Sequence, residues 1–392
     1  MDGNHGTENV GNNRDKSAKV GDAHSNKGSS ESDRTKEEDK GSAKTKYMSC
    51  SGHKGEVTSN REFSTKGVTA AEGSRFVASD NCKNSGKDGN VATTGSYASE
   101  IAEHYNRITT KSYVERKKSS IISIRNMNNF IKSVLFNLYI AKNDRVLDLG
   151  CGKGGDLLKY KKIGISYYYG LDIADKSIDE CTLRYNRHRC PFKADFDVCD
   201  VYHSTLNLGR QFDVISIQFS FHYSFESEDS FAATKHNINE HLLENGYLLL
   251  TVPDRDVILR RYHRSKAEND VTEKNNSEQQ TKSNISFGNE YYTIEFPANP
   301  SDRVFGNQYY FHLQEAVNEC VEFLIDIRYL VQEMKKINLL VVENTNFMSF
   351  YNANSGKFAG LRRKMLPMRL NTDEVKVMEL YRVIVFQKMN GR

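Results

Sequence analysis

The segment "VLDLGCGKGGDLL", Val146–Leu158, is an apolar run that passes through four glycines into a second apolar stretch. Glycines between a strand and a helix usually allow a ligand to approach the backbone closely. The spacing Gly150-x-Gly152-x-x-Gly155 satisfies the dinucleotide fingerprint. A phosphate-cradling P-loop is excluded, because Gly155 is followed by Asp156 and not by the required lysine. The segment therefore predicts a ligand site at the end of a strand.

Three acidic residues stand at the ends of successive predicted strands. Asp148 precedes the first glycine by two positions, and a carboxylate there repels a pyrophosphate but suits a cationic ligand such as S-adenosylmethionine. Asp172 is placed to accept hydrogen bonds from two ribose hydroxyls, and Asp200 to read an adenine amino group. We therefore prefer a methyl donor to a dinucleotide, with two solvated loop acids beside a capped helix as the structural alternative.

Strand and helix patterns alternate along the chain after residue 119. The predicted strands are 145–150, 166–173, 196–200, 212–220, 246–254, 339–344 and 381–388, and the predicted helices are 119–140, 155–162, 176–187 and 229–243. Such alternation indicates an α/β fold with a parallel sheet covered on both faces. The pattern Asp148-x-Gly150-x-Gly152-x-Gly154 resembles the first motif of class I S-adenosylmethionine-dependent methyltransferases. The resemblance implies their Rossmann-like, mixed seven-stranded sheet.

The first 98 of the 392 residues differ in composition from the rest. Residues 1–98 contain no Leu, Ile or Pro, so they cannot bury enough apolar surface to offset the entropy of ordering. We predict a disordered polar tail over 1–98 and one catalytic domain over 99–392. A second polar run, 266–286, is predicted to be a mobile surface insertion.

Charge and cysteine content exclude several classes of protein. The net charge of +4 permits a nucleic-acid partner without arguing for one. No apolar run is long enough for a signal peptide or a membrane span, so we expect no membrane association. The seven cysteines form neither a C-x-x-C pair nor a disulfide framework, which suits reduced thiols in the cytosol or nucleus. We predict no metal site.

Four further segments carry a closer family resemblance. "IRNMNNFIKSVL", "VLDLGCGKGGDLLK", "DIADKSI" and "QFSFHYSFES" together resemble the cellular mRNA cap guanine-N7 methyltransferases. The resemblance runs from "EIAEHYNRI" (Glu100–Ile108) to the final "LYRVIVFQK", with the motifs in the same order throughout. Only the glycine loop is shared with other methyltransferases, so the Asn-Asn and His-Tyr segments carry the specificity.

The resemblance implies roles for individual residues. On the cofactor side it implies that the methyl donor is bound by Lys132, Asp148, Gly150, Asp172, Asp200, Gln218 and Tyr223. On the cap side it implies contacts from Asn128, Asn129, Lys153, Lys159, Arg184, His222, Glu322 and Tyr381. Each of these residues could instead have a purely structural role. Lys159 and Arg184 would then be solvated helix charges, and His222 and Tyr381 would be core residues. Glu322, between Val321 and Phe323, needs a partner if it is buried.

The implied reaction is methyl transfer from S-adenosylmethionine to N7 of the guanosine cap of mRNA. Guanine N7 carries no proton, so we expect catalysis by positioning and electrostatics, with no general base. The implied partners are capped mRNA and, as candidates, RNA polymerase II or a capping guanylyltransferase, and the implied location is the nucleus. We expect a monomer, and the tail is too short and polar to be a guanylyltransferase domain itself. A methyltransferase acting on another base, RNA nucleotide or protein, and an inactive RNA-binding scaffold, remain the alternatives.

Overall fold

The computed structural model describes residues 82–84, 97–108, 113–275 and 284–391. Most of the predicted disordered tail, 1–98, therefore lies outside the described residues. Within it, Cys82–Asn84 forms the short strand β1, which pairs antiparallel with β5 (Ser204–Leu206). The tail prediction stays a prediction for the remaining residues.

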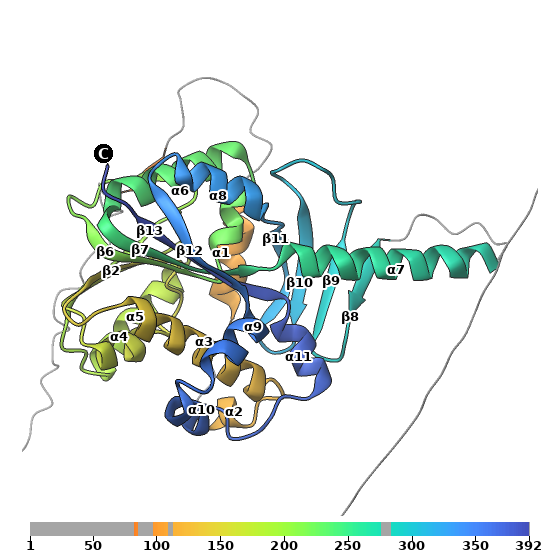
Figure 1. The fold of residues 1–392 in the computed structure, drawn as a ribbon, viewed down its shortest axis with the longest axis horizontal. Coiled ribbons are helices and arrows are strands. Elements are labelled where there is room, and N and C mark those ends of the chain that lie inside the picture. Colours follow the sequence, from red (N-terminus) through yellow and green to blue (C-terminus); the bar gives the residue numbers. More distant parts are fainter. Residues whose placement is uncertain (1–81, 85–96, 109–112, 276–283, 392) are drawn as a thin grey trace, which may run out of the picture. The chain divides into compact units, whose positions relative to one another are not determined.

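A mixed seven-stranded sheet forms the centre of the described fold (Figure 1). Its order is β12 (Leu339–Asn346), β13 (Tyr381–Lys388), β7 (Leu242–Pro253), β6 (Phe212–Gln218), β2 (Arg145–Leu149), β3 (Tyr167–Asp172) and β4 (Lys193–Val198). Strand β13 runs antiparallel to both of its neighbours, and the other pairs are parallel. This arrangement confirms the predicted class I methyltransferase sheet.

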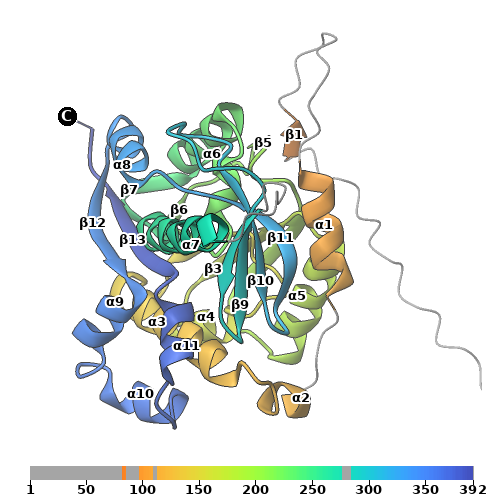
Figure 2. The same cartoon turned by 90° about the vertical axis from the view of Figure 1, so that its right-hand side faces the viewer.

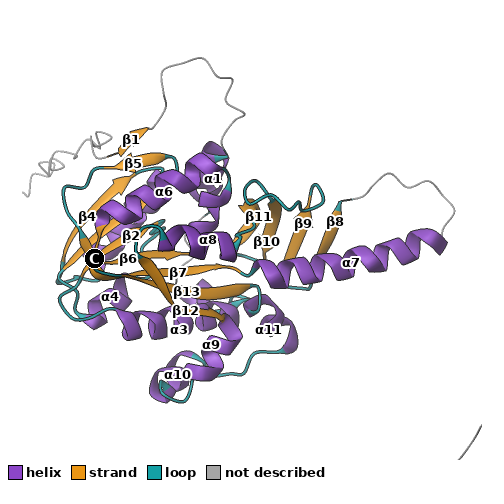
Figure 3. Ribbon diagram, turned by 45° about the horizontal axis from the view of Figure 1, so that its top comes forward, coloured by secondary structure: helices purple, strands orange, loops and turns teal. Residues whose placement is uncertain are grey.

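Helices cover both faces of this sheet (Figures 1 and 3). On one face lie α3 (Ile122–Tyr139), α4 (Leu157–Ile163) and α5 (Asp175–Arg187), and on the other lie α6 (Glu228–His241) and α8 (Ile327–Lys335). Because both faces are covered, the central strands are buried along nearly their whole length, as in "RVLDL" and "FDVISIQ". The apolar spacing in α3 buries its Phe130, Ile131 and Val134.

A second sheet was not predicted from the sequence. Four antiparallel strands, β8 (Ile285–Gly288), β9 (Tyr292–Phe296), β10 (Gln308–Leu313) and β11 (Val317–Phe323), lie side by side next to the long helix α7 (Arg255–Asn275) (Figures 1 and 2). Strand β11 contacts the short helix η1 (Phe221–Phe225), which follows β6. This contact brings a distant part of the chain to the carboxyl edge of the central sheet.

Helix α7 (Arg255–Asn275) corrects part of the predicted mobile insertion. The first ten residues of 266–286 are helical, and 285 and 286 belong to β8, whereas 276–283 lie outside the described residues. A polar run is compatible with an exposed helix, because helix formation depends on backbone propensity as well as on apolar burial. The remaining helices are α1 (Ala98–Arg107), α2 (Tyr113–Lys117), α9 (Phe347–Asn354), α10 (Ala359–Met365) and α11 (Thr372–Met378). None of the described helices has the length and apolar character that crossing a membrane requires.

Candidate functional site

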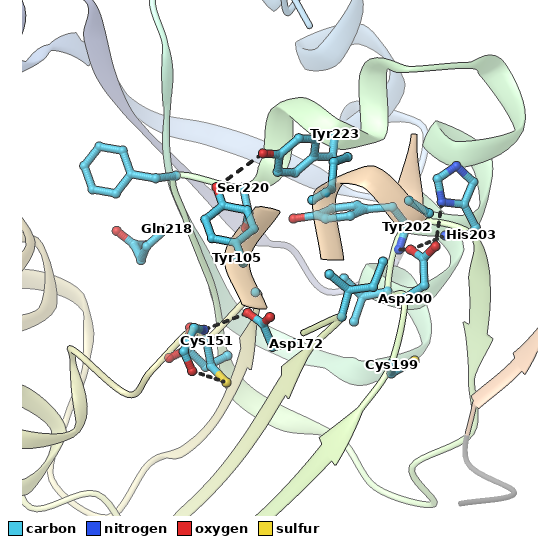
Figure 4. A pocket seen from close by; sticks show the side chains of 18 of the residues that line it. Tyr105, Cys151, Asp172, Cys199, Asp200, Tyr202, His203, Gln218, Ser220 and Tyr223 are labelled. Carbon is cyan, nitrogen blue, oxygen red and sulfur yellow. Dashed lines mark hydrogen bonds and ion pairs between the residues drawn. The ribbon is translucent and has the colours of Figure 1, made fainter. Parts of the chain in front are cut away.

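A cavity of about 250 Å³ opens at the carboxyl ends of β2, β3, β4 and β6 (Figure 4). We call it the strand-end cavity. All seven residues predicted on the cofactor side line it: Lys132, Asp148, Gly150, Asp172, Asp200, Gln218 and Tyr223. The three acids and Gln218 meet there because the parallel strands that carry them end at one edge of the sheet. Lys132 reaches the cavity from α3, and Tyr223 from the short helix η1.

The glycine loop forms the floor of this cavity. Gly150 has a φ of +71°, and a Cβ atom at this position would lie 2.4 Å from the Ser220 Oγ. A side chain here would therefore be strained and would also collide with the loop after β6. The Gly150 and Cys151 backbone N–H groups both donate to the Leu171 carbonyl, which fixes the turn against β3. The loop exposes backbone where a ligand can approach it closely.

Asp148 is a buried carboxylate at the edge of the cavity. Its Oδ2 accepts a hydrogen bond of 3.0 Å from the Tyr168 hydroxyl. Burial, and then the nearby charge of Asp156, raise the pKa of Asp148 to about 7. A cationic ligand in the cavity would favour the ionised form of this group.

Asp172 is fixed by the backbone at the end of β3. Its Oδ2 accepts from the Gly152 N–H at 2.8 Å, and its Oδ1 accepts from the Ala174 N–H at 2.9 Å. Burial raises the pKa of Asp172, and these two hydrogen bonds oppose the rise. Each carboxylate oxygen keeps a further lone pair, so the fixed side chain can still accept from two hydroxyls.

Lys132 reaches the cavity as part of a charged network that the sequence did not reveal. Asp156 accepts from Lys132 Nζ at 2.7 Å and from Lys159 Nζ at 2.6 Å. Burial alone would raise the pKa of Asp156, but the two ammonium groups hold it well below its usual range. Lys159 also donates to the Asn129 Oδ1 at 2.8 Å. Lys159 is thus a paired group whose side chain is only 11% exposed, and it is not a solvated helix charge.

Buried polar atoms without a hydrogen-bond partner among the described residues occur on several residues of the site, including Gln218 and Asn128. Gln218 donates to the Leu249 carbonyl at 3.0 Å, but its Oε1 is unpaired, as is the Oδ1 of Asn128. Buried acceptors of this kind normally find a partner, so their presence favours a polar ligand. The unpaired Gln218 oxygen, the glycine floor and three carboxylates together fit a cationic, adenosine-containing methyl donor.

A second group of polar side chains lies on η1, β10, β11 and β13. We call His222, Tyr309, Glu322 and Tyr381 the Glu322 cluster. The Glu322 side chain is 9% exposed, and its Oε2 accepts from the Tyr309 hydroxyl at 2.6 Å. Burial raises the pKa of Glu322 to about 7.

His222 does not neutralise Glu322. The distance from its Nε2 to the Glu322 Oε1 is 3.9 Å, and burial lowers the pKa of His222 to about 3. A neutral imidazole at this distance forms neither an ion pair nor a hydrogen bond. Both ring nitrogens of His222 lack partners among the described residues, so it is not a satisfied core histidine. The cluster therefore presents a buried carboxylate and two unpaired ring nitrogens.

Tyr381 and its aromatic neighbours complete this side of the site. Its ring centroid lies 5.1 Å from that of Phe219, which lines the strand-end cavity, and 5.6 Å from that of Phe347. Burial, followed by the charge of Glu322, raises the pKa of Tyr381 well above its usual value. Tyr381 is thus packed in an aromatic cluster and also lies within the field of Glu322.

Lys153 and Arg184 lie near one another beside the glycine loop. Lys153 donates to the Ile108 carbonyl at the end of α1, and burial lowers its pKa with a further contribution from Arg184. The Arg184 guanidinium is 3.4 Å from Glu180 on the same helix. None of the predicted cap-side residues lines the strand-end cavity.

Several residues of the site were missed from the sequence. Tyr105 of α1 lines the cavity, and its hydroxyl lies 3.3 Å from the hydroxyl of Tyr223, which in turn lies 3.5 Å from the Cys320 Sγ. His203 and Glu226 also line the cavity. The segment "EIAEHYNRI" contains Tyr105, but only the packing of α1 across the cavity shows that the side chain reaches it.

The cysteine prediction requires one correction. Cys199 is disulfide-bonded, whereas Cys151, Cys181, Cys190 and Cys320 are free. The expectation that all thiols are reduced is therefore wrong at Cys199. Spacing along the chain could not reveal this bond, because a disulfide depends on which cysteines meet in space.

Comparisons with known proteins agree with this geometry. Residues 90–389 match the family model described as the mRNA (guanine-N(7))-methyltransferase domain. The mRNA cap guanine-N(7) methyltransferase 1 of Oryza sativa is 35% identical over 314 residues, covering 75% of this chain and 82% of that protein. Its namesake from Arabidopsis thaliana is 33% identical, covering 76% and 83%. The mRNA cap guanine-N(7) methyltransferase of Schizosaccharomyces pombe is 32% identical, covering 73% and 79%.

Proposed function

Because this chain belongs to the mRNA (guanine-N7)-methyltransferase family, we propose that it catalyses by positioning and electrostatics, without a general base. Its reaction is the transfer of a methyl group from S-adenosylmethionine to N7 of the guanine in the mRNA cap. When bound, S-adenosylmethionine supplies a methyl group on a positively charged sulfur that leaves readily. The task left to the chain is to align donor and acceptor, which can be worth roughly 7–11 kcal/mol.

On the donor side, we assign one role to each polar group of the strand-end cavity. Asp172 accepts from the ribose hydroxyls, Asp200 from the adenine amino group, and Lys132 binds the carboxylate of the methionine part. Asp148 supplies negative charge beside the cationic ligand. The glycine floor at Gly150 admits the ligand, and Gln218 and Tyr223 complete the walls.

On the acceptor side, the carboxylate of Glu322 accepts from the N1 and N2 hydrogens of guanine. The positive charge that develops on the purine during methylation strengthens these hydrogen bonds, so they favour the transition state over the ground state. His222, neutral and with both nitrogens unpaired, offers a further hydrogen bond, and Tyr381 offers an aromatic face worth about 0.5–2 kcal/mol toward a cation.

The cap phosphates belong beside the glycine loop in this proposal. Lys153 and Arg184 clamp the triphosphate, each exchanging or sharing its present partner, Ile108 or Glu180. Asn128 and Asn129 of α3 contact the cap, and Lys159 acts through its bond to Asn129. The unpaired Oδ1 of Asn128 supports this assignment.

A single observation carries the proposal: Glu322 is buried with no cationic partner among the described residues, and its neighbour His222 is neutral. Removing a carboxylate from water is costly unless it is paired. Because this desolvation cost lowers the stability of the fold, we infer that the Glu322 carboxylate serves to bind a ligand. Neither Glu322 nor His222 is needed as a base, since N7 has no proton to lose.

The substrate is capped mRNA. We further propose that residues 99–392 form the catalytic domain, that the chain acts as a monomer in the nucleus, and that RNA polymerase II or a capping guanylyltransferase recruits it. The nuclear location is proposed because caps are added to transcripts as they are made. Co-purification of the tagged chain from nuclear extract, followed by measurement of its mass in solution, tests these points.

The direct test is a methyl-transfer assay on three RNAs of one sequence: GpppN-capped, ApppN-capped and uncapped. We expect transfer to the GpppN-capped RNA only, with the product identified as 7-methylguanosine after nuclease digestion. Equal transfer to all three would contradict the assignment of Glu322 to the guanine edge.

A further inference from the structure

His203 follows β4 and binds the carboxylate that faces the strand-end cavity. Its Nδ1 lies 2.9 Å from the Oδ2 of Asp200, and the two side chains meet at the wall of the pocket in Figure 4. The Oδ1 of Asp200 accepts from the backbone N–H groups of Tyr202 and His203, each at 3.2 Å. The loop after β4 therefore curls around Asp200 and returns His203 to it.

The other ring nitrogen of His203 reaches a different element. Its Nε2 lies 2.9 Å from the Ser230 Oγ in the first turn of α6 and 3.4 Å from the Glu226 Oε2. The second oxygen of Glu226 accepts from the backbone N–H of Tyr97 at 3.2 Å, immediately before α1. One imidazole thus joins the end of β4 to the start of α6 and, through Glu226, to the start of α1.

The two carboxylates beside His203, those of Asp200 and Glu226, favour the cationic form of its imidazole. The hydrogen bond to Asp200, and then the nearby carboxylate of Glu226, raise the pKa of His203 to about 10, although burial opposes the rise. His203 therefore carries two N–H donors at neutral pH, one directed at each neighbouring element.

The contacts of Asp200 determine how many of its acceptor sites remain for a ligand in the cavity. A carboxylate offers about four acceptor sites, and the two backbone amides and His203 occupy three of them. One site on Oδ2 is left for a ligand. A carboxylate held in this way offers one directed acceptor, which suits a single amino hydrogen.

We propose that His203 is a positioning residue for the methyl donor: it holds Asp200 with one acceptor toward the adenine amino group and ties that carboxylate to the entrance helices α6 and α1. This inference rests on the proposed role of Asp200. His203 touches neither reacting atom, so its effect falls on donor affinity and not on the methyl-transfer step.

Three variants of the full chain separate the two contacts of the imidazole. In His203→Asn the amide nitrogen replaces Nδ1 and still donates to Asp200, but it cannot reach Ser230. In His203→Gln the amide nitrogen replaces Nε2 and reaches Ser230, but it loses Asp200. His203→Ala removes both contacts. For each variant, S-adenosylmethionine binding is measured by calorimetry, melting temperature by calorimetric scan, and KM and kcat by methyl transfer to a capped dinucleotide.

We expect His203→Ala and His203→Gln to bind S-adenosylmethionine about tenfold more weakly, the equivalent of one charge-assisted hydrogen bond. Their KM for the donor should rise in parallel, with kcat at saturating donor within about twofold of the native value, and His203→Asn should recover most of the affinity. Equal donor affinity in the native chain and in His203→Ala, with only a lower melting temperature, would show a structural link and overturn the proposal. Equal weakening in His203→Asn and His203→Gln would overturn it as well.

Asp200→Ala distinguishes failure of this inference from failure of the donor site. If Asp200→Ala binds the donor as tightly as the native chain, Asp200 does not read the adenine, and both proposals fall. If Asp200→Ala weakens binding and His203→Ala does not, the donor site stands and only the role of His203 is wrong.

Discussion

The strand-end cavity is built mostly from residues between 132 and 226, whereas the Glu322 cluster joins η1, β10, β11 and β13 across more than a hundred residues. In the cavity, Asp172 and Asp200 accept hydrogen bonds from the backbone of their own loops. In the cluster, Glu322 is bound only by Tyr309 of the neighbouring strand, among the described residues, and His222 by no hydrogen bond.

This difference indicates how the two halves are prepared for their ligands. Local backbone donors fix the donor-side carboxylates before any ligand arrives. The acceptor side instead keeps polar groups buried without full partners, at a cost to stability that a ligand would relieve. Substitutions in the cavity should therefore change donor affinity, and substitutions in the cluster should change transfer while sparing the fold.

The largest effect is expected for Glu322→Gln. This change keeps the shape but removes the charge and turns one acceptor into a donor facing guanine, so transfer should fall about 100-fold. Donor affinity, measured by calorimetry, should not change. The control is Glu319→Gln, an exposed glutamate on the same strand, which should transfer normally.

The melting temperature of Glu322→Gln is a second test of the role of Glu322. At a pH between the normal pKa of a glutamate and the raised pKa of Glu322, about 7, Glu322 is more protonated in the native state than in the unfolded state. The carboxylate therefore lowers stability as pH rises through that window. Glu322→Gln should consequently match or exceed the native melting temperature at pH 8. A lower melting temperature with normal transfer would identify Glu322 as structural and reverse the comparison.

Asp172→Ala should weaken S-adenosylmethionine binding at least tenfold. The change removes two hydrogen bonds to a charged acceptor, worth about 1.5–3 kcal/mol each before relaxation. The affinity for a cap analogue should stay the same, since the Glu322 cluster is separate. Unchanged donor affinity would mean that the strand-end cavity is not the donor site.

Donor affinity should rise about fivefold between pH 6 and pH 8. Below the pKa of Asp148, about 7, this carboxyl group is protonated and attracts a cationic ligand less strongly. Binding therefore strengthens as pH rises and the group ionises. Calorimetry of the native chain beside Asp148→Asn checks this, because the variant should bind with an affinity that varies less over the same range.

The smallest effect is expected from shortening the chain to begin at Tyr97. The shortened chain loses β1, a strand of three residues, and the disulfide bond of Cys199, because the four other cysteines after residue 97 are free. Every described residue of the cavity and of the cluster remains. Transfer to a capped dinucleotide should stay within about twofold, because the removed part lacks core-forming residues. A large loss of turnover would place part of the tail in the active site. The site would then not consist of the strand-end cavity and the Glu322 cluster alone.

Much of the donor side was open to prediction. The acids at 148, 172 and 200 lie at or just after the carboxyl ends of three parallel strands. Parallel strands must end at one edge of a sheet, so their meeting followed from the pattern. The network of Lys132, Asp156 and Lys159 did not follow, because a lysine near the middle of a helix has no periodicity that indicates its partner. His203 was missed because it lies in the loop after β4, where no periodicity indicates which side chains it meets.

By itself, the sequence determined where the core strands lie along the chain, the glycine turn and the three carboxylates, because these depend on short-range patterns of burial and backbone conformation. Through its family resemblance it also indicated the reaction. Only the tertiary structure decided that β10 and β11 form a hairpin against η1, which places Glu322 3.9 Å from His222, a hundred positions away in the chain. It alone decided that His222 is neutral and Glu322 unpaired by a cation, because both properties depend on desolvation and on which groups meet in space.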